Sequence, residues 1–245
     1  MKLLSTLICL LLLATSAAAA GSAVGYEVDG SAFEGYYVTP AADAPLVLLI
    51  HDWDGLGDYE IKRAEMLAAL GYAVFAADLF GKGIRPATID ERKQRTGALY
   101  ADRPRMRTLL QGALAAAKQQ GARIDNAVAA GYCFGGAAVL ELARSGADLK
   151  GFVSFHGGLD LPPGQDYSKV PGSILVLHGT ADSSVSMDDF ATLAVALETS
   201  GVRHEMITYG GAPHAFTVFG GDRYRQDADL KSWQRFSDYL AATLR

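Results

Sequence analysis

The stretch "AVAAGYCFGGAAVLELA", residues 127–143, decides the fold because its character changes near the middle. Its first six residues are small or apolar, which predicts a buried strand. The residues from Phe134 onward predict a helix, and Cys133 lies at the apex of the turn between the two. Gly131, Cys133 and Gly135 have the form G-x-C-x-G, the strand–turn–helix elbow that exposes a nucleophile, here with sulfur in place of oxygen. Glycine is expected two positions either side because larger side chains would collide with the neighbouring strand and helix.

The elbow predicts chemistry at the sulfur. The helix that starts at Phe134 directs its N-terminal dipole at Cys133, which favours the thiolate and predicts a lowered thiol pKa. The alternative is a structural cysteine buried in a tight turn.

Strand-like and helix-like runs alternate through the rest of the chain. An antiparallel hairpin is expected over Tyr26 to Pro40, around an Asp29-Gly30 turn. Further strands are expected at residues 46–51, 72–78, 127–132, 151–156, 173–179 and 204–209, and helices at about 58–70, 90–100, 104–120, from 134 onward, 187–200 and 224–244. This alternation predicts an α/β fold with a mostly parallel sheet covered on both faces. Residues 21–245 contain no repeat or linker, so we expect one domain, with its ligand beyond the carboxyl ends of the strands.

The N-terminus has the pattern of a secretory signal peptide over residues 1–20. A lysine near the start precedes the apolar run Leu3–Leu13, and Ala18–Ala20 form a small-residue cleavage pattern. The run is too short for a bilayer, which needs about 20 residues, so an uncleaved anchor is the lesser alternative. Cleavage after Ala20 implies the periplasm or the exterior, and it removes Cys9. Cys133 then has no disulfide partner within the chain, so its thiol is either buried and inert or used.

Composition narrows the class of partner. The chain has 245 residues, 50% of them hydrophobic, which is enough for one sizeable core. The formal net charge of −5 argues against a nucleic-acid partner. The locally basic segment Asp90 to Arg107 is interpreted as the solvated face of two helices. No segment after residue 20 is long and apolar enough to span a membrane, so a small-molecule substrate is expected.

Two residues after later strands complete a catalytic constellation. Asp182 and His214 each follow an expected strand, in the chain order nucleophile, acid, histidine. His214 is expected to act as general base and Asp182 to orient it, the alternative for Asp182 being a helix cap or turn aspartate. The developing oxyanion needs N–H donors. We expect those of Phe134 and of Trp53 in "HDWDGLGD", and a core role for the Trp53 ring is compatible with this.

The other histidines are assigned differently. His156 ends a strand near the expected pocket rim and is a candidate substrate-binding residue. His178 is interpreted as structural, His204 as solvated, and His51 as a residue that orders the loop after it. No two of the histidines have metal-ligand spacing, so neither a metal nor a cofactor is expected.

With "GYCFGG", a downstream Asp182 and "PHAF" around His214, nearly the whole mature chain resembles the dienelactone hydrolase family. The resemblance implies an α/β-hydrolase fold without a separate lid domain. It also implies a Cys-His-Asp triad that opens lactone or ester bonds through a thioester acyl-enzyme. A family glutamate that influences the thiol corresponds to Asp52, a candidate thiol modulator.

Family members that act on dienelactone hold the substrate carboxylate with two arginines, and this chain departs from them. Lys82 stands at one of these places and keeps the charge but not the bidentate fork. Val218 stands at the other place, where the positive charge is missing, and Arg223 or Arg225 nearby would have to compensate. The substrate is therefore not necessarily dienelactone, and a less anionic or larger ester fits equally well. Candidate substrate-binding residues are therefore Lys82, His156 and Arg223.

Together these residues predict a secreted hydrolase of esters or lactones that needs no cofactor. The alternative is a non-catalytic ligand-binding or redox-sensing protein on the same fold, because a lone thiol at a helix N-terminus can be oxidised reversibly. A third hypothesis is a hydrolase of peptide or thioester bonds, which no residue of the expected pocket favours.

Overall fold

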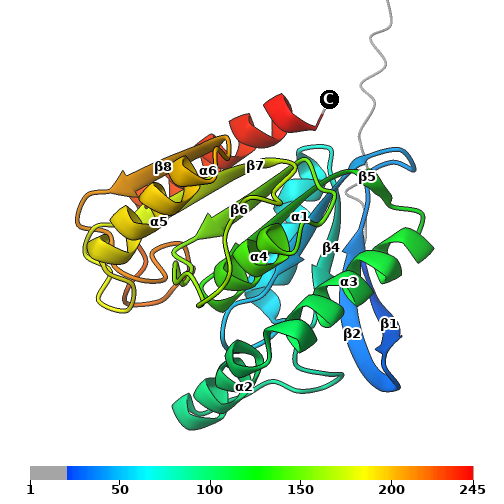
Figure 1. Cartoon of the computed structure of the whole chain (residues 1–245). Helices are drawn as coiled ribbons and strands as arrows, with labels where there is room; N and C mark the ends of the chain where they lie inside the picture. The colour runs from blue at the N-terminus through cyan, green and yellow to red at the C-terminus, as the bar shows by residue number, and fades with distance from the viewer. Residues whose placement is uncertain (1–20, 245) are drawn as a thin grey trace, which may run out of the picture.

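The computed structural model describes residues 21–244, which form one eight-stranded sheet with helices on both faces (Figure 1). The signal-peptide prediction concerns residues 1–20 and lies outside the described residues. The strands are β1 (Ser22–Val28), β2 (Ser31–Val38), β3 (Pro45–Ile50), β4 (Ala73–Ala77), β5 (Arg123–Tyr132), β6 (Gly151–Phe155), β7 (Ser173–Gly179) and β8 (His204–Tyr209). The helices are α1 (Asp58–Ala69), α2 (Ile89–Ala101), α3 (Arg103–Gln119), α4 (Phe134–Arg144), α5 (Met187–Thr199) and α6 (Gln226–Thr243).

The sheet is mostly parallel, as the sequence predicts. Its strand order is β1-β2-β4-β3-β5-β6-β7-β8, and β4, β3, β5, β6, β7 and β8 all pair in parallel. The predicted hairpin is β1 and β2, which pair antiparallel around the turn at Asp29 and Gly30, and β2 adds antiparallel to β4. This arrangement is the α/β-hydrolase fold.

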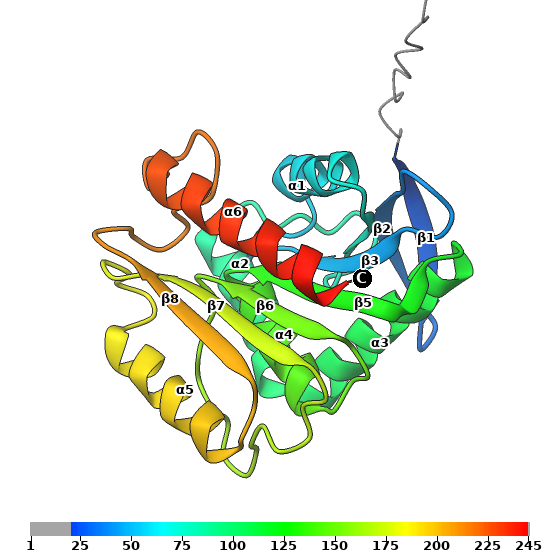
Figure 2. The ribbon, with the colours of Figure 1, turned by 90° about the horizontal axis from the view of Figure 1, so that it is seen from above.

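Alternate residues of the central strands supply two separate cores. In β3, Leu46, Leu48 and Ile50 pack in one core with residues of α3, α4 and α5. Val47 and Leu49 pack in the other with residues of α1 and α6. Figure 2 shows α1 and α6 on one face of the sheet and α3, α4 and α5 on the other. Side chains of a strand alternate between faces, so a strand covered on both sides must be apolar throughout, as β3 is.

The chain order of the strands creates a crevice at one end of the sheet. From β3 the chain runs to its neighbour β4, and from β4 it crosses back to β5 on the other side of β3. Connections therefore leave β3 and β5 toward opposite sides. Ligands of open α/β sheets bind at such a switch point, beyond the carboxyl ends of the strands. The loop after β3 and the elbow after β5 both lie there.

Helix α2 stands out from the body at the lower edge of Figure 1. Only Thr96 and Leu99 of this helix are buried. No separate lid domain is present among residues 21–244. Within the same residues, none of the helices combines the length and apolar character needed to cross a bilayer.

Candidate active site

Cys133 occupies a sharp and strained turn between β5 and α4. Its φ of 52° lies in the left-handed region, which costs a non-glycine residue free energy of order 1–3 kcal/mol. A Cβ on Gly131 would overlap the backbone of Gly135, and a Cβ on Gly135 would overlap the carbonyl of Ile50. The Cys133 N–H donates to the Phe155 carbonyl at 3.0 Å, which ties the apex to β6. The glycines of the motif are therefore required by backbone-to-backbone contact.

The turn brings the sulfur to a histidine and an aspartate from the far end of the chain. His214 Nε2 lies 3.1 Å from Cys133 Sγ, and His214 Nδ1 lies 2.8 Å from Asp182 Oδ2. Asp182 follows β7 and His214 follows β8, so neighbouring parallel strands deliver both side chains to one edge of the sheet. The structure thus brings together all three residues of the predicted triad in a continuous hydrogen-bonded line.

Asp182 is held as an acceptor for His214. Its side chain is fully buried, and Oδ1 accepts the N–H groups of Ser184 at 2.8 Å and Val185 at 2.9 Å. Burial alone would raise the pKa of Asp182, but the hydrogen bonds from His214 and from the two backbone N–H groups hold it below its ordinary value. An ionised Asp182 leaves His214 with Nδ1–H and a free Nε2 that faces the sulfur.

The prediction of a lowered thiol pKa is wrong. Burial and, after it, the nearby Asp52 carboxyl raise the pKa of Cys133 to about 12. The Phe134 N–H and the charge of Arg223 act in the opposite direction but do not prevail. The prediction rests on the helix dipole, whereas desolvation of the sulfur by the walls of the site has the larger effect on the thiol pKa.

The loop after β3 presents Trp53 beside the sulfur. Asp52 N–H donates to Glu60 Oε1 at 3.3 Å, Gly57 N–H donates to Glu60 Oε2 at 2.9 Å, and Asp54 N–H donates to Asp52 Oδ1 at 3.0 Å. These bonds leave the Trp53 N–H without an acceptor among residues 21–244, as an oxyanion donor requires. The loop is therefore fixed mainly by Glu60, a residue that the sequence analysis missed.

His51 orders this loop, as the sequence predicts. Its ring is fully buried, Nε2 accepts the Leu79 N–H at 3.1 Å, and Nδ1 lies 2.6 Å from the Asp52 carbonyl. Burial lowers the pKa of His51, in keeping with a neutral ring that accepts at one nitrogen and donates at the other. The ring thereby links the loop after β3 to the loop after β4.

Two buried carboxyl groups, Asp52 and Glu60, lie at the loop after β3, and Asp52 borders the same cleft as the sulfur. Burial raises the pKa of Asp52 to about 9, and the Asp54 and Glu60 carboxyls add to this. Burial also raises the pKa of Glu60, to about 7, although three backbone N–H groups oppose the increase. Asp52 is therefore protonated at neutral pH, and its side chain adds no negative charge to the site under those conditions.

Two clefts meet at Cys133 and share Trp53, His214 and Arg223. The first, called here the apolar cleft, has a volume of about 320 Å³. Its remaining lining residues are Thr96, Tyr100, Phe134, Gly158, Asp160, Ser184 and Val185. The second has a volume of about 470 Å³ and is further lined by Asp52, Asp54, Arg92, Ala215, Val218, Gly221 and Asp222. It is called the polar cleft here only because of the charged side chains in this lining, since most of its surface is apolar too. A substrate with its reacting carbon at the sulfur can therefore extend to two sides.

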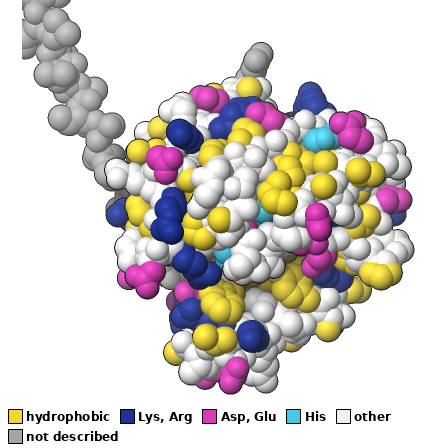
Figure 3. Space-filling model, turned by 90° about the vertical axis from the view of Figure 1, so that its left-hand side faces the viewer, with side chains coloured by type: hydrophobic (Ala, Val, Ile, Leu, Met, Phe, Trp, Pro, Cys, Tyr) yellow, Lys and Arg dark blue, Asp and Glu magenta, His cyan; other side chains and the backbone are white. Residues whose placement is uncertain are grey.

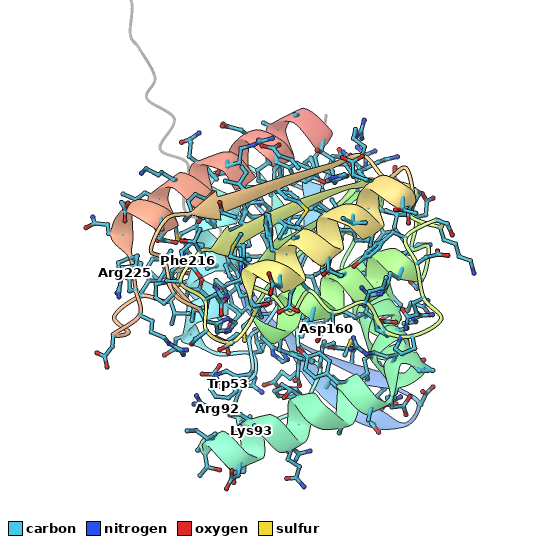
Figure 4. All side chains as sticks on the ribbon, turned by 60° about the vertical axis from the view of Figure 1, so that its left-hand side comes forward. Trp53, Arg92, Lys93, Asp160, Phe216 and Arg225 are labelled. Carbon is cyan, nitrogen blue, oxygen red and sulfur yellow. The ribbon has the colours of Figure 1, made fainter. Side chains whose placement is uncertain are left out.

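The side chains around the clefts mix charge and apolar surface. Figure 3 shows a face on which hydrophobic side chains lie between Lys/Arg and Asp/Glu side chains. Figure 4 shows Trp53 and Arg92 close together between α2 and the body, with Asp160 on the other side of Trp53. The Arg92 guanidinium lies 5.4 Å from the Trp53 ring centroid and 3.5 Å from Asp54. Arg92 therefore holds α2 against the loop after β3, which carries Trp53, the predicted oxyanion donor.

Two of the predicted substrate-binding residues, Lys82 and His156, do not line either cleft. Lys82 does not line either cleft; its N–H donates to the Ala32 carbonyl and its ammonium pairs with Glu34 at 3.2 Å, because the loop after β4 turns toward the hairpin. His156 is fully buried, and its Nε2 lies 2.8 Å from Thr217 Oγ1, behind His214 and away from the clefts. Arg223, the third such residue, borders both clefts, and its role in binding substrate stays a prediction.

The sequence analysis also missed cleft residues in the basic segment. Thr96 and Tyr100 of α2 face the apolar cleft, and Arg92 faces the polar cleft, so this helix is not simply solvated. Arg103 and Arg107 pair with the buried carboxylate of Glu141. A sequence signal existed in the spacing of Thr96 and Tyr100, which puts them on one side of a helix. Among the described residues, no three His, Cys, Asp or Glu side chains are grouped as metal ligands would be.

Comparisons with known proteins agree with this geometry. The sequence model of the Dienelactone hydrolase family matches residues 33–244. A solved structure described as a dienelactone hydrolase-like promiscuous phosphotriesterase from metagenomic libraries is similar, with 29% identity and a TM-score of 0.88, over 94% of this chain and 100% of that one.

Curated relatives point the same way. A Salmonella typhimurium protein named "Putative carboxymethylenebutenolidase" is 24% identical over 87% of this chain and 84% of its own length. A Synechocystis protein of the same name is 26% identical over 86% and 92%. The family model spans most of the chain, and the elbow, loops and sheet order fit it. The chain therefore belongs to the dienelactone hydrolase family and is a hydrolase of ester or lactone bonds.

Proposed function

We propose that the protein hydrolyses carboxylic esters or lactones with Cys133 as nucleophile, His214 as general base and acid, and Asp182 as the group that orients His214. The observation that carries this is the line from Sγ through the imidazole to the Asp182 carboxylate, with distances of 3.1 and 2.8 Å, at the junction of two clefts. A nucleophile, a base within hydrogen-bond reach and an orienting carboxylate are the parts that acyl transfer needs.

The thiol pKa of about 12 determines how the first step runs. The sulfur attacks the substrate carbonyl carbon while His214 Nε2 takes the thiol proton, because little free thiolate precedes attack. The carbonyl oxygen becomes an oxyanion and accepts N–H groups from Phe134 and Trp53. Collapse breaks the ester C–O bond, and His214 returns the proton to the departing alkoxide. Water, deprotonated by His214, then attacks the thioester and releases the acid and the thiol.

Two side chains of the polar cleft have proposed accessory roles. Asp52 modulates the thiol, since its ionised form disfavours the thiolate. Arg223 holds an anionic group of the substrate, because its exposed side chain borders both clefts, whereas the other arginine of the polar cleft, Arg92, pairs with Asp54. These two proposals concern which substrates are bound and how fast they react. The proposed roles of the three triad residues do not depend on them.

Phosphotriesters are a second candidate substrate class. The observation in favour is the 29% identity and 0.88 TM-score to a protein described as a promiscuous phosphotriesterase. The Cys133 sulfur would attack the phosphorus atom in place of a carbonyl carbon, and the bond from phosphorus to the departing alcohol or phenol oxygen would break.

Export is part of the proposal. The pattern of residues 1–20 supports cleavage after Ala20 and a mature enzyme in the periplasm or outside the cell. N-terminal sequencing of the protein from a periplasmic fraction tests this, and an intact Met1 in that fraction would contradict it.

The activity test uses residues 21–245 and a panel of p-nitrophenyl esters, lactones including a dienelactone, and a p-nitrophenyl phosphotriester. We expect turnover of at least one carboxylic substrate that disappears in Cys133→Ala and in His214→Asn. His204→Asn is the matched control, since His204 lies on β8 far from the sulfur and pairs with Glu198; it should keep the wild-type rate. Equal background rates in wild type and Cys133→Ala across the panel would overturn the hydrolase proposal and favour the binding or redox-sensing alternative.

A further inference from the structure

The buried guanidinium of Arg63 lies where several parts of the site meet. Arg63 belongs to α1, and its side chain is 1% exposed. The guanidinium pairs with Asp229 in the first turn of α6 and donates to the Thr217 carbonyl at 2.9 Å. Thr217 lies three residues after His214 on the segment 210–225 between β8 and α6, called here the histidine loop. Arginine only donates and a carbonyl oxygen only accepts, so this hydrogen bond has one possible direction.

Four aromatic rings from four segments surround the guanidinium. Its central carbon lies 4.2 Å from the ring centroid of Phe219 on the histidine loop and 5.8 Å from that of Tyr132, the last residue of β5. The rings of Tyr59 on α1 and Trp233 on α6 complete the set, at 5.3 and 4.9 Å. Tyr132 directly precedes Cys133 in the chain. A single side chain therefore lies against both the elbow that carries the sulfur and the loop that carries the imidazole.

The same helix also holds the loop after β3. Glu60 lies one turn before Arg63 on α1, and its carboxyl oxygens accept the N–H groups of Asp52 and Gly57. The loop after β3 and the histidine loop form the two sides of the polar cleft, and both are fastened to α1. Helix α1 is therefore the common support of the elbow, the predicted oxyanion donor and the predicted base.

Stability is a weak reason to bury an arginine at this place. A guanidinium and a carboxylate lose their hydration when they are buried, and apolar side chains of the same size usually stabilise a fold at least as well. What the guanidinium adds is direction, because its planar fork fixes the Thr217 carbonyl and the Asp229 carboxylate relative to each other. An apolar side chain would fill the space but would not hold the histidine loop at one distance from the elbow.

We propose that Arg63 is a positioning residue for His214, which holds the histidine loop against Tyr132 and so maintains the 3.1 Å between His214 Nε2 and Cys133 Sγ. A general base must lie within hydrogen-bond reach of the proton that it takes, and a displacement of about 1 Å can lower a rate about a hundredfold. Arg63 lines neither cleft, so it acts on the reaction only through the loop. The inference rests on the role proposed for His214.

The test variant is Arg63→Met/Asp229→Leu, which replaces the ion pair with two apolar side chains and leaves no unpaired buried charge. Urea unfolding should give a free energy of unfolding close to that of wild type. The kcat for the best substrate of the panel should nevertheless fall by about tenfold or more, with a smaller change in KM, because a displaced base affects the reacting geometry more than substrate binding. A wild-type kcat in this variant would refute the positioning role.

A single substitution at the same position makes the test independent of how well the double variant folds. Arg63→Lys keeps the positive charge beside Asp229 but has no planar fork and no flat face for the Phe219 ring. We expect it to fold like wild type and to have a lower kcat. A kcat equal to that of wild type would overturn the claim that the guanidinium geometry positions the base.

The matched control is Arg235→Met/Glu205→Leu, which removes another ion pair of α6. Arg235 Nε donates to Glu205 Oε1 at 2.8 Å, and Glu205 lies near the start of β8, at the opposite end of the strand from His214. This variant should keep the wild-type kcat. A fall in kcat equal to that of Arg63→Met/Asp229→Leu would mean that any ion pair lost from α6 slows the enzyme, and it would overturn the specific role of Arg63.

Crystal structures of wild type and of the Arg63 variants decide the inference without a substrate. We expect the Nε2–Sγ distance to be near 3.1 Å in wild type and beyond hydrogen-bond reach in the variants, with the histidine loop displaced from Tyr132. If wild type hydrolyses nothing, the proposed function fails and these distances alone decide the positioning. If wild type is active and the variants keep both its kcat and its Nε2–Sγ distance, the positioning role is refuted while the hydrolase stands.

Discussion

At Cys133, opposing local influences act on the thiol. The Phe134 N–H at the start of α4 favours the thiolate, whereas burial and the Asp52 carboxyl favour the thiol. The effect of burial is the larger one, because a thiolate loses its hydration when it is buried and one hydrogen bond from the Phe134 N–H does not make up for that loss. The sulfur is therefore stored as a thiol, and attack depends on a base that is already in place.

This protonation state can be measured by alkylation. Iodoacetamide should modify Cys133 slowly at pH 7 and faster with each rise in pH, without a plateau up to pH 10, because the thiol pKa is about 12. Asp52→Asn should leave the rate unchanged at pH 7, where Asp52 is protonated, and raise it above pH 9, where the ionised Asp52 of wild type disfavours the thiolate. Mass spectrometry gives the rates, and a plateau below pH 9 would refute the prediction.

The control for this prediction lies on the same cleft. Asp222 lines the polar cleft and is exposed, and it is not one of the main groups that shift the pKa of Cys133. Asp222→Asn should be alkylated like wild type at each pH. An equal increase in alkylation rate in both variants would mean that the overall negative charge of the cleft, and not Asp52 in particular, controls the ionisation of Cys133.

The glycines of the elbow allow a second test at this scale. Gly131→Ala places a methyl group into the Gly135 backbone and should lower the free energy of unfolding by about 1–3 kcal/mol, because that backbone has no room to move. Gly97→Ala, in α2 with nothing within 4 Å of the added carbon, is the control and should be neutral or stabilising. Urea unfolding measures both, and equal effects would contradict the packing argument.

Among the elements, α2 decides the shape of the site. It supplies Thr96 and Tyr100 to the apolar cleft and Arg92 to the polar cleft, although it stands apart from the body. The capping box of Thr88 and Glu91 fixes where the helix begins. Because the start of α2 is fixed, the positions of Arg92, Thr96 and Tyr100 along the helix, and hence their places in the clefts, are fixed too.

Tyr100→Ala should widen the apolar cleft and shift specificity toward longer acyl or aryl groups. We expect kcat/KM for a p-nitrophenyl octanoate to rise relative to the acetate by about tenfold, the effect of a few buried methylene groups. Lys93→Ala, on the exposed side of α2, is the control. An unchanged ratio in Tyr100→Ala would show that the acyl chain lies in the polar cleft instead.

Strands and helices were largely predictable because a single physical pattern encodes each. The run "LVLLIH" could only be a strand covered on both faces, and β3 spans Pro45–Ile50. The predicted final helix from Tyr224 begins two residues later, at Gln226, because Arg225 N–H donates to the Phe216 carbonyl instead of starting the helix. The spacing of Thr96 and Tyr100 predicts only that they share one side of α2, and the mostly polar pattern of this helix does not indicate which part of the protein that side faces.

Site residues were predictable where a motif fixes the backbone and not elsewhere. Gly131 and Gly135 determine the place of Cys133, so the sequence sufficed there. The wrong placement of His156 arose because a strand end was taken to point outward, while the chain turns there at positive φ. Glu60 and Thr217 act through contacts between segments far apart in the sequence, which no local pattern records.

For the whole molecule, the buried carboxyls link stability to pH. Unfolded Asp and Glu titrate near pH 4, whereas folded Glu60 and Asp52 have pKa values raised to about 7 and about 9. The folded state therefore binds more protons, so the stability from these groups is complete below about pH 4 and is lost as pH rises through 7 and 9. Burial that shapes the oxyanion loop thus weakens the fold in alkali.

Asp52→Asn should make the free energy of unfolding less dependent on pH between 4 and 9. The asparagine cannot ionise, so nothing opposes its burial as pH rises. Asp43→Asn, at an exposed position, is the control and should keep the wild-type slope. Urea titrations at several pH values measure this, and identical slopes in wild type and Asp52→Asn would refute it.

The sheet order also has a consequence for the protein while it is being made. The elbow and the oxyanion loop follow central strands, but Asp182 and His214 follow β7 and β8, the last strands to be synthesised and the edge of the sheet. A nascent chain can therefore carry the proposed nucleophile before the proposed base is present. With the proposed triad, hydrolysis would begin only when the C-terminal strands have docked, and a chain that ends before β8 would be inactive.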